Sequence, residues 1–135
     1  MRVNGWTEKL DQVITERRAM PFAWGINDCA LFCADCVLEI TGIDYAADWR
    51  GRYTTAIGSV RLLNKNGGSV EKIIDGMFEV IPQQFLQRGD IALFNVGNGE
   101  TIGICLGAQI AAPGYLGLEF IPLRECRKGW RVCRK

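Results

Sequence analysis

The sequence predicts an α+β fold in which helices come first and an antiparallel sheet follows. Apolar residues recur at helical spacing as far as Met77. From Ile91 onward, short apolar runs alternate with glycine-containing turns, which is typical of strands. Between residues 29 and 40 the chain is apolar on almost every side, which indicates a buried central helix. These features favour helices packed on one sheet, within a single domain that spans residues 1–135.

Composition excludes several classes of function. The chain has 135 residues, of which 48% are hydrophobic and 23% charged, as in ordinary soluble domains with one core. A net charge of +1 provides no field that would attract nucleic acid or anionic lipid. No apolar run reaches the roughly 18–20 residues of a membrane span, and the first ten residues lack the apolar centre of a signal peptide. We therefore expect folding in a cytoplasm, where disulfides are rare.

The first helix is expected to start at a Thr7 cap and to run to about Arg18. Pro21 ends this region, because the residue before a proline disfavours helical dihedral angles. The apolar stripe of this first helix consists of Leu10, Val13 and Ile14 and marks it as a packing helix.

The central helix follows a tight turn and begins at Cys29. Either Asn27 or Asp28 can cap it, because a side-chain oxygen accepts the unpaired N–H groups of the first turn. A cysteine at this end of a helix is favoured as a thiolate by the helix dipole. We expect the helix to end near Thr41 at Gly42, which can adopt the left-handed cap conformation.

The segment from Asp44 to Tyr53 combines aromatic residues with two arginines. It is either a binding loop or a connector in which the arginines pair with Asp44 and Asp48. Two more helices follow, with Thr54 or Thr55 opening the first and Ser69 capping the second. The first of these carries an apolar stripe that consists of Ile57, Val60, Leu62 and Leu63. It is closed by Asn66-Gly67-Gly68.

The last third of the chain predicts an antiparallel meander. Gly97-Asn98-Gly99 is read as a hairpin turn between the first two strands. The expected strands are 91–96, 101–106, 109–112, 118–123 and 130–133. The tail is basic, and we interpret it as a solvated edge or a protein contact instead of a nucleic-acid site. Its basic residues are Arg124, Arg127, Lys128, Arg131, Arg134 and Lys135.

A helix-borne cysteine that precedes a small antiparallel sheet is the layout of papain-like hydrolases. Three stretches resemble the signature sequences of the NlpC/P60 superfamily of cell-wall peptidases, whose nucleophile is a cysteine. They are Asp28-Cys29, residues 88–94 (RGDIALF) and residues 101–107 (TIGICLG). The resemblance implies a papain-like fold with Cys29 at the nucleophile position.

A narrower resemblance covers nearly the whole chain. WGxNDCALF, the RGRY that ends at Tyr53, the Gly89-Asp90 strand and the closing Trp130-Arg131 resemble small phage-encoded NlpC/P60-like proteins from tail-tip gene clusters. This resemblance implies a structural component of the phage tail tip or baseplate, located in the virion tail after assembly in the host cytoplasm. Its partners would be other tail-tip or baseplate proteins, with peptidoglycan as a further candidate.

The resemblance also implies that catalytic residues are missing. Thr101 occupies the position of the family's histidine, and the third polar position falls near Ala111 or Ala112. The chain contains no histidine at all. Loss of general acid–base catalysis typically costs about 10²–10⁴-fold in rate. We therefore expect a degenerate cysteine peptidase; the alternative is an active hydrolase of peptidoglycan stem peptides that receives a histidine from a partner chain. Candidate binding residues are Asp28, Trp24, Arg50, Arg52 and Tyr53.

A metal site is the remaining alternative, and otherwise no cofactor is expected. Cys29, Cys33 and Cys36 form a C-x3-C-x2-C pattern that could hold zinc or an iron–sulfur cluster. Three ligands on one continuous apolar helix suit tetrahedral geometry poorly, so small buried apolar side chains are the favoured interpretation of most of these cysteines. A fourth ligand would come from Cys105, Cys126 or Cys133.

Overall fold

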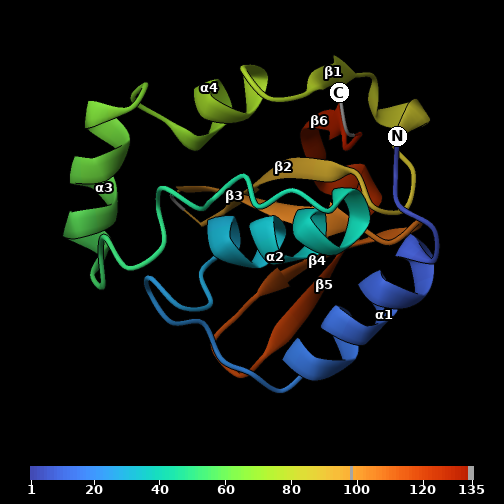
Figure 1. Ribbon diagram of the computed structural model, residues 1–135, viewed down its shortest axis with the longest axis horizontal. Coiled ribbons are helices and arrows are strands. Elements are labelled where there is room, and N and C mark those ends of the chain that lie inside the picture. Colours follow the sequence, from blue (N-terminus) through green and yellow to red (C-terminus); the bar gives the residue numbers. More distant parts are fainter. Residues whose placement is uncertain (98, 134–135) are drawn as a thin grey trace.

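The computed structural model describes residues 1–97 and 99–133. The helices come first, and they are α1 (Trp6–Arg17), α2 (Cys29–Thr41), α3 (Ala56–Lys65) and α4 (Val70–Asp75). The strands follow as β1 (Glu79–Ile81), β2 (Ile91–Val96), β3 (Gly99–Cys105), β4 (Gln109–Pro113), β5 (Leu118–Pro122) and β6 (Cys126–Arg131). Short 3-10 turns lie at Gln83–Phe85 and Leu123–Glu125. The predicted α+β class is confirmed (Figure 1).

The strands form one antiparallel sheet with the order β1-β6-β2-β3-β4-β5. The expected meander is correct from β2 to β5 and wrong for the last strand. β6 begins at Cys126, not at Trp130, and returns to pair with β2 on the side opposite β3. Trp130 explains the return, because its ring is fully buried and its Nε1 donates to Asp75 of α4 at 2.9 Å. Asn98, in the expected hairpin turn, lies outside the described residues.

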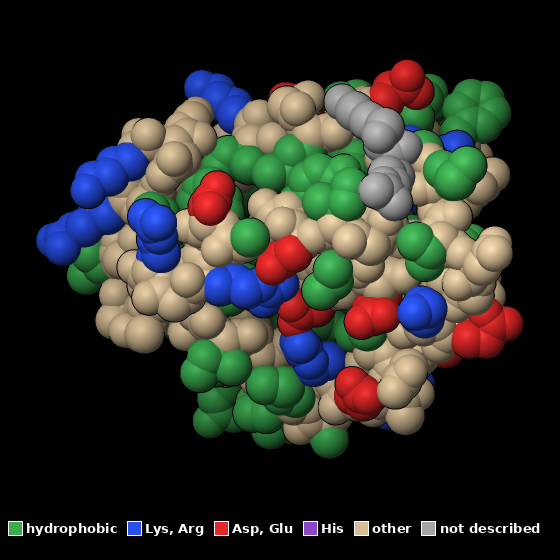
Figure 2. All heavy atoms as spheres, viewed as in Figure 1, with side chains coloured by type: hydrophobic (Ala, Val, Ile, Leu, Met, Phe, Trp, Pro, Cys, Tyr) green, Lys and Arg blue, Asp and Glu red, His purple; other side chains and the backbone are tan. Residues whose placement is uncertain are grey.

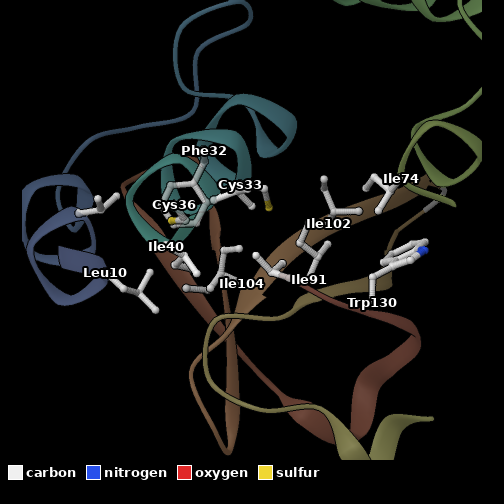
Figure 3. Packing of buried hydrophobic residues seen from close by; sticks show 14 of the residues in the cluster. Leu10, Phe32, Cys33, Cys36, Ile40, Ile74, Ile91, Ile102, Ile104 and Trp130 are labelled. Carbon is white, nitrogen blue, oxygen red and sulfur yellow. The ribbon is translucent and has the colours of Figure 1, made fainter. Parts of the chain in front are cut away.

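The core lies between α2 and the sheet. Phe32 and Ile40 of α2 are fully buried and lie opposite Ile104 of β3 (Figure 3). α1 packs against α2 through its expected apolar stripe, in which Leu10 is fully buried. Because α2 is apolar on nearly all sides, it can be covered by α1 and the sheet together, as its composition predicts.

The N-cap residues predicted from the sequence are confirmed in three of the four helices. Asp28 caps α2, and Thr55 and Ser69 cap α3 and α4, each accepting from a backbone N–H. The Thr7 cap of α1 is wrong: Gly5 is the N-cap residue at φ 75°, and the Thr7 hydroxyl donates to Glu8 instead. The chain can start the helix two residues earlier than expected because glycine tolerates a left-handed entry.

α3 stands at one end of the molecule and α4 lies along its upper edge, and together they form an arm (Figure 1). α4 buries Ile74, but α3 buries none of its side chains despite its apolar stripe. Two α3 side chains remain largely in solvent, Ile57 at 66% and Val60 at 54% exposure. The stripe was predicted correctly, but no described part of the chain covers it fully.

The basic tail pairs with acidic residues of the arm and the sheet. Lys128 contacts Glu71 and Asp75, and Arg127 contacts Glu71 and Glu100. The pairs with Glu71 and Asp75 connect α4 to β6, and the pair with Glu100 connects β3 to β6, so this part of the tail forms contacts within the chain. Arg134 and Lys135 lie outside the described residues. No helix in the described ranges is both long enough and apolar enough to span a bilayer.

Candidate functional site

The turn before α2 places Cys29 at the first helical position. The Asp28 side chain is buried and uses both oxygens to hold this turn. Its Oδ1 accepts from the Leu31 N–H at 2.9 Å, and its Oδ2 accepts from the Gly25 N–H at 2.9 Å and the Tyr53 hydroxyl at 2.6 Å. Asp28, proposed above as a binding residue, is thus a structural cap that positions Cys29.

Tyr53 reaches the site from the segment after α2. Burial and the hydrogen bond to Asp28 raise the pKa of its hydroxyl well above the ordinary value, so Tyr53 stays protonated and donates. The Tyr53 carbonyl also packs so closely on Gly25 that a Cβ there would lie 2.1 Å from the oxygen. Two segments far apart in the sequence therefore support the same turn.

Tyr53→Phe is expected to lower the free energy of unfolding by about 1.5–3 kcal/mol, because a hydrogen bond to a charged acceptor is lost. Urea unfolding measures this change. Tyr115→Phe is the matched control, since Tyr115 is 88% exposed and should show no change. Equal losses in the two variants would contradict the role assigned to Tyr53.

The Cys29 sulfur faces the start of β3. The Thr101 side chain and the Ile102 backbone lie beside this sulfur, and their polar groups lower the pKa of the thiol. Burial acts in the opposite direction and is the largest influence, so the pKa of Cys29 lies above its ordinary value. The helix position alone predicts a thiolate. Burial of the sulfur therefore opposes the influence of the helix end.

Alkylation of Cys29 is therefore expected to be slow at pH 7 and to keep rising with pH beyond 9. A raised pKa leaves the protonated thiol dominant at neutrality, and only the thiolate attacks. Iodoacetamide labelling followed by peptide mass spectrometry at several pH values measures the profile. A plateau below pH 8 would show that the thiolate is already formed and would contradict this assignment.

The two further positions that the motif resemblance assigns to a catalytic site carry no acid–base side chain. Thr101 lies beside the sulfur, where the family pattern has histidine. Ala111 and Ala112 are buried in β4, and Ala111 pairs with Ile104. Asp28 does not replace a base, because both its oxygens already accept hydrogen bonds. The site thus combines a thiol with a hydroxyl and has no imidazole.

The remaining candidate binding residues do not converge on Cys29. Arg50 pairs with Asp44, as expected. Its second partner is Asp35 of α2 at 2.6 Å, and not Asp48. Arg52 is exposed. Trp24 is 40% exposed and packs edge-on against Phe22, with 4.8 Å between ring centroids. Arg50 thus anchors the connector to α2.

The cysteine pattern on α2 does not form a cluster. Cys33 and Cys36 lie among core side chains (Figure 3), and burial raises the pKa of both thiols. Across residues 1–97 and 99–133, no group of three or more potential ligands is arranged to hold a metal ion. Cys105 is buried in β3, while Cys126 and Cys133 are partly exposed. This geometry gives the metal alternative no support.

Sequence reasoning missed a furrow next to Cys29. An outer pocket of about 240 Å³ is bounded by Cys29, Thr101, α3 and the start of α4. It adjoins an inner apolar slot of about 90 Å³ between α2, the connector and α4. Figure 2 shows hydrophobic side chains in a hollow of this face. The exposed apolar stripe of α3 was the one sequence signal for it, because such a stripe normally faces an apolar partner.

Comparison with known proteins agrees with this architecture. The structure resembles the crystal structure of the NlpC/p60 domain of the peptidoglycan hydrolase SagA, with a TM-score of 0.58 and 16% sequence identity. The match covers 96% of this chain and 99% of that domain. The fold is therefore of the NlpC/p60, papain-like type. The chain itself belongs to the family of the domain of unknown function DUF6950, whose model matches residues 1–132. A search of curated proteins found no match.

Proposed function

We propose that this chain is a non-hydrolytic NlpC/P60-like domain that serves as a structural component of a phage tail tip or baseplate. The observation that carries the first part is the Thr101 side chain beside the Cys29 sulfur, in a chain without histidine. A cysteine peptidase needs a group that protonates the leaving amine, and a threonine hydroxyl has no suitable pKa near neutrality.

The tail assignment is supported by the motif resemblance described above. In this role the partners are other tail-tip or baseplate proteins, the location is the virion tail, and no cofactor is needed. Peptidoglycan remains a further candidate ligand.

Two measurements test this function. Purified protein incubated with muropeptides is expected to release no product, and mass spectrometry of purified tails from the encoding phage is expected to detect the chain at a fixed stoichiometry. Absence of the chain from intact tails would refute the structural role.

The second candidate function is an active cysteine hydrolase completed by a histidine from a partner chain. The retained Cys29, open to the outer pocket, favours it. Muropeptide cleavage that appears with the partner and disappears in Cys29→Ala would establish this activity and overturn the proposed non-hydrolytic role.

A further inference from the structure

Three segments that lie far apart in the sequence meet on one side of the molecule. The turn at residues 24–26 packs against the segment that leads into α3, since a Cβ at Gly25 would lie 2.1 Å from the Tyr53 carbonyl oxygen. The Phe22 N–H donates to the Gly114 carbonyl at 2.8 Å, which holds the β4–β5 turn beside the same loop. α3 lies at the left of Figure 1, and the two turns lie at the lower left. We call the exposed side chains of these segments the loop–helix surface, and it comprises residues 24–26, 52–65 and 114–117.

Exposed hydrophobic side chains are concentrated on the loop–helix surface. Of the ten large hydrophobic side chains that are exposed among the described residues, six belong to it. Tyr115 and Leu116 are 88% and 84% exposed, so they project from the β4–β5 turn and do not pack on the sheet. The other four are Trp24, Ile26, Ile57 and Val60. Figure 2 shows hydrophobic side chains gathered at the lower left, where Figure 1 has the two turns. Single exposed apolar residues are ordinary, but a group of them marks an interaction site.

The same surface carries basic side chains without acidic partners. Ile57, Arg61 and Lys65 of α3 are four positions apart, so apolar and basic groups share one broad face of the helix. Residues 49–70 include no Asp or Glu. Arg52, Arg61 and Lys65 are exposed, and none of them forms an ion pair with an acidic residue in the part of the chain that the structure describes. The surface is therefore locally positive, although the whole chain has a net charge of only +1.

An anionic bilayer matches both properties of this surface. Trp and Tyr side chains are favoured at the depth of lipid headgroups, and amphipathic basic helices lie in the same layer with their cations near phosphate groups. Lipid also adapts its shape to protruding side chains such as Tyr115 and Leu116, whereas a rigid partner needs a hollow for each of them. A nucleic acid would satisfy the cations but leave the apolar side chains in water. The combination of charge and apolar tips thus favours lipid.

We propose that the loop–helix surface docks this protein on a bilayer that contains anionic phospholipid. The tips of the two turns and the exposed face of α3 enter the headgroup layer, and Arg52, Arg61 and Lys65 face lipid phosphates. α3 buries none of its side chains within its own chain, so lipid would provide the apolar contact for Ile57 and Val60. The inference goes beyond the proposed function, since it concerns a different surface and does not depend on the chemistry of Cys29.

Vesicle co-sedimentation tests the choice of lipid. The protein is expected to bind vesicles of equal parts phosphatidylglycerol and phosphatidylcholine about 10- to 100-fold more tightly than vesicles of phosphatidylcholine alone, because each basic side chain near the membrane favours anionic lipid. Increasing the salt concentration from about 0.1 M to about 1 M should weaken binding to the mixed vesicles, since the screening length falls from about 10 Å to about 3 Å. Equal affinity for the two vesicle types, or binding to neither, would overturn the proposal.

Exposed apolar positions provide the first matched pair of variants. Leu116→Glu and Ile57→Glu are each expected to weaken binding to the mixed vesicles about 10-fold or more, because an apolar contact is replaced by a charge that anionic lipid repels. Phe85→Glu is the control, since Phe85 is also exposed but follows β1, away from α3 in Figure 1. All three side chains lie in solvent, so the melting temperatures should match that of the parent chain. Equal losses in Phe85→Glu and the other two variants would contradict the proposed location.

Charge reversal provides the second pair. The double variant Arg61→Glu/Lys65→Glu is expected to weaken binding to the mixed vesicles about 10-fold or more, whereas Lys9→Glu/Arg124→Glu should stay within about 3-fold of the parent chain. Both double variants change the net charge equally, and all four positions are exposed. A loss of the same size in both would show that only the net charge matters, and it would overturn the proposed surface.

Sedimentation velocity without lipid separates a bilayer from a second copy as the partner. The parent chain is expected to sediment as a monomer. A dimer that dissociates in Leu116→Glu would make the loop–helix surface an interface between copies of this chain, and it would overturn the lipid assignment.

Discussion

Thr101→His is expected to increase the alkylation rate of Cys29 at pH 7 by about 10- to 1,000-fold. The new imidazole would lie beside the sulfur that the Thr101 side chain now contacts. A cation at this distance favours the thiolate and lowers the pKa of the thiol, which offsets the effect of burial. Iodoacetamide labelling resolved by mass spectrometry measures the rate, with Cys126 in the same sample as the internal reference.

Two controls separate the charge of the imidazole from other effects of the substitution. Thr101→Asn changes the side chain and keeps a polar group but cannot carry a positive charge, so its rate should stay near that of the parent chain. Asn95→His adds an imidazole at an exposed position of β2 and should also change little. If Thr101→His and Thr101→Asn react at the same rate, the imidazole does not reach the sulfur and the assigned geometry is wrong.

Rescue of peptide cleavage by Thr101→His alone is not expected. In the family pattern a third polar residue orients the histidine, and here that position falls at Ala111 or Ala112, which are buried and apolar. Thiolate formation needs charge close to the sulfur, whereas protonation of a leaving amine needs an oriented imidazole. The single variant therefore tests the electrostatics of the site without requiring hydrolysis.

Local features of the fold were predictable because they depend on nearby residues. The caps at Asp28 and Ser69 and the C-terminal Gly42 each follow from hydrogen bonds or dihedral angles within a few positions. The position of β6 was not predictable in this way. Its pairing with β2 joins residues 32 to 39 positions apart and depends on burial of Trp130 against α4, which periodicity does not report.

The features of the candidate site also divide into those that the sequence predicts and those that it does not. The order of the motifs was sufficient to place Thr101 opposite Cys29, since both lie in recognisable sequence stretches. The furrow was not visible, because its walls come from α2, the connector, α3, α4 and the sheet, and each contributes ordinary apolar residues. The internal contacts of Asp28 and Arg50 were not visible in the sequence for a related reason. Their polar partners, Tyr53 and Asp35, are 25 and 15 positions away in the sequence.

The largest effect on stability is expected at Asp90, which connects both ends of the chain to the sheet. Its carboxylate is fully buried and accepts from Arg2 at 2.7 Å and from Arg131 at 3.1 Å. It also accepts from the backbone N–H groups of Gln87 at 2.8 Å and Val132 at 3.1 Å. The Gly89-Asp90 motif was recognised in the sequence only as part of a family signature. The structure shows four donors from three segments of the chain meeting at one carboxylate.

Asp90→Ala is expected to lower the free energy of unfolding by about 3–5 kcal/mol, because two arginines and two backbone groups lose their acceptor together. Glu100→Ala is the control, since it removes an exposed pair with Arg127 and should cost less than about 1 kcal/mol. Urea unfolding compares the two. A loss at Asp90 no larger than that at Glu100 would mean that water replaces the carboxylate. The ends of the chain would then be held by apolar packing of β6 and not by this buried anion.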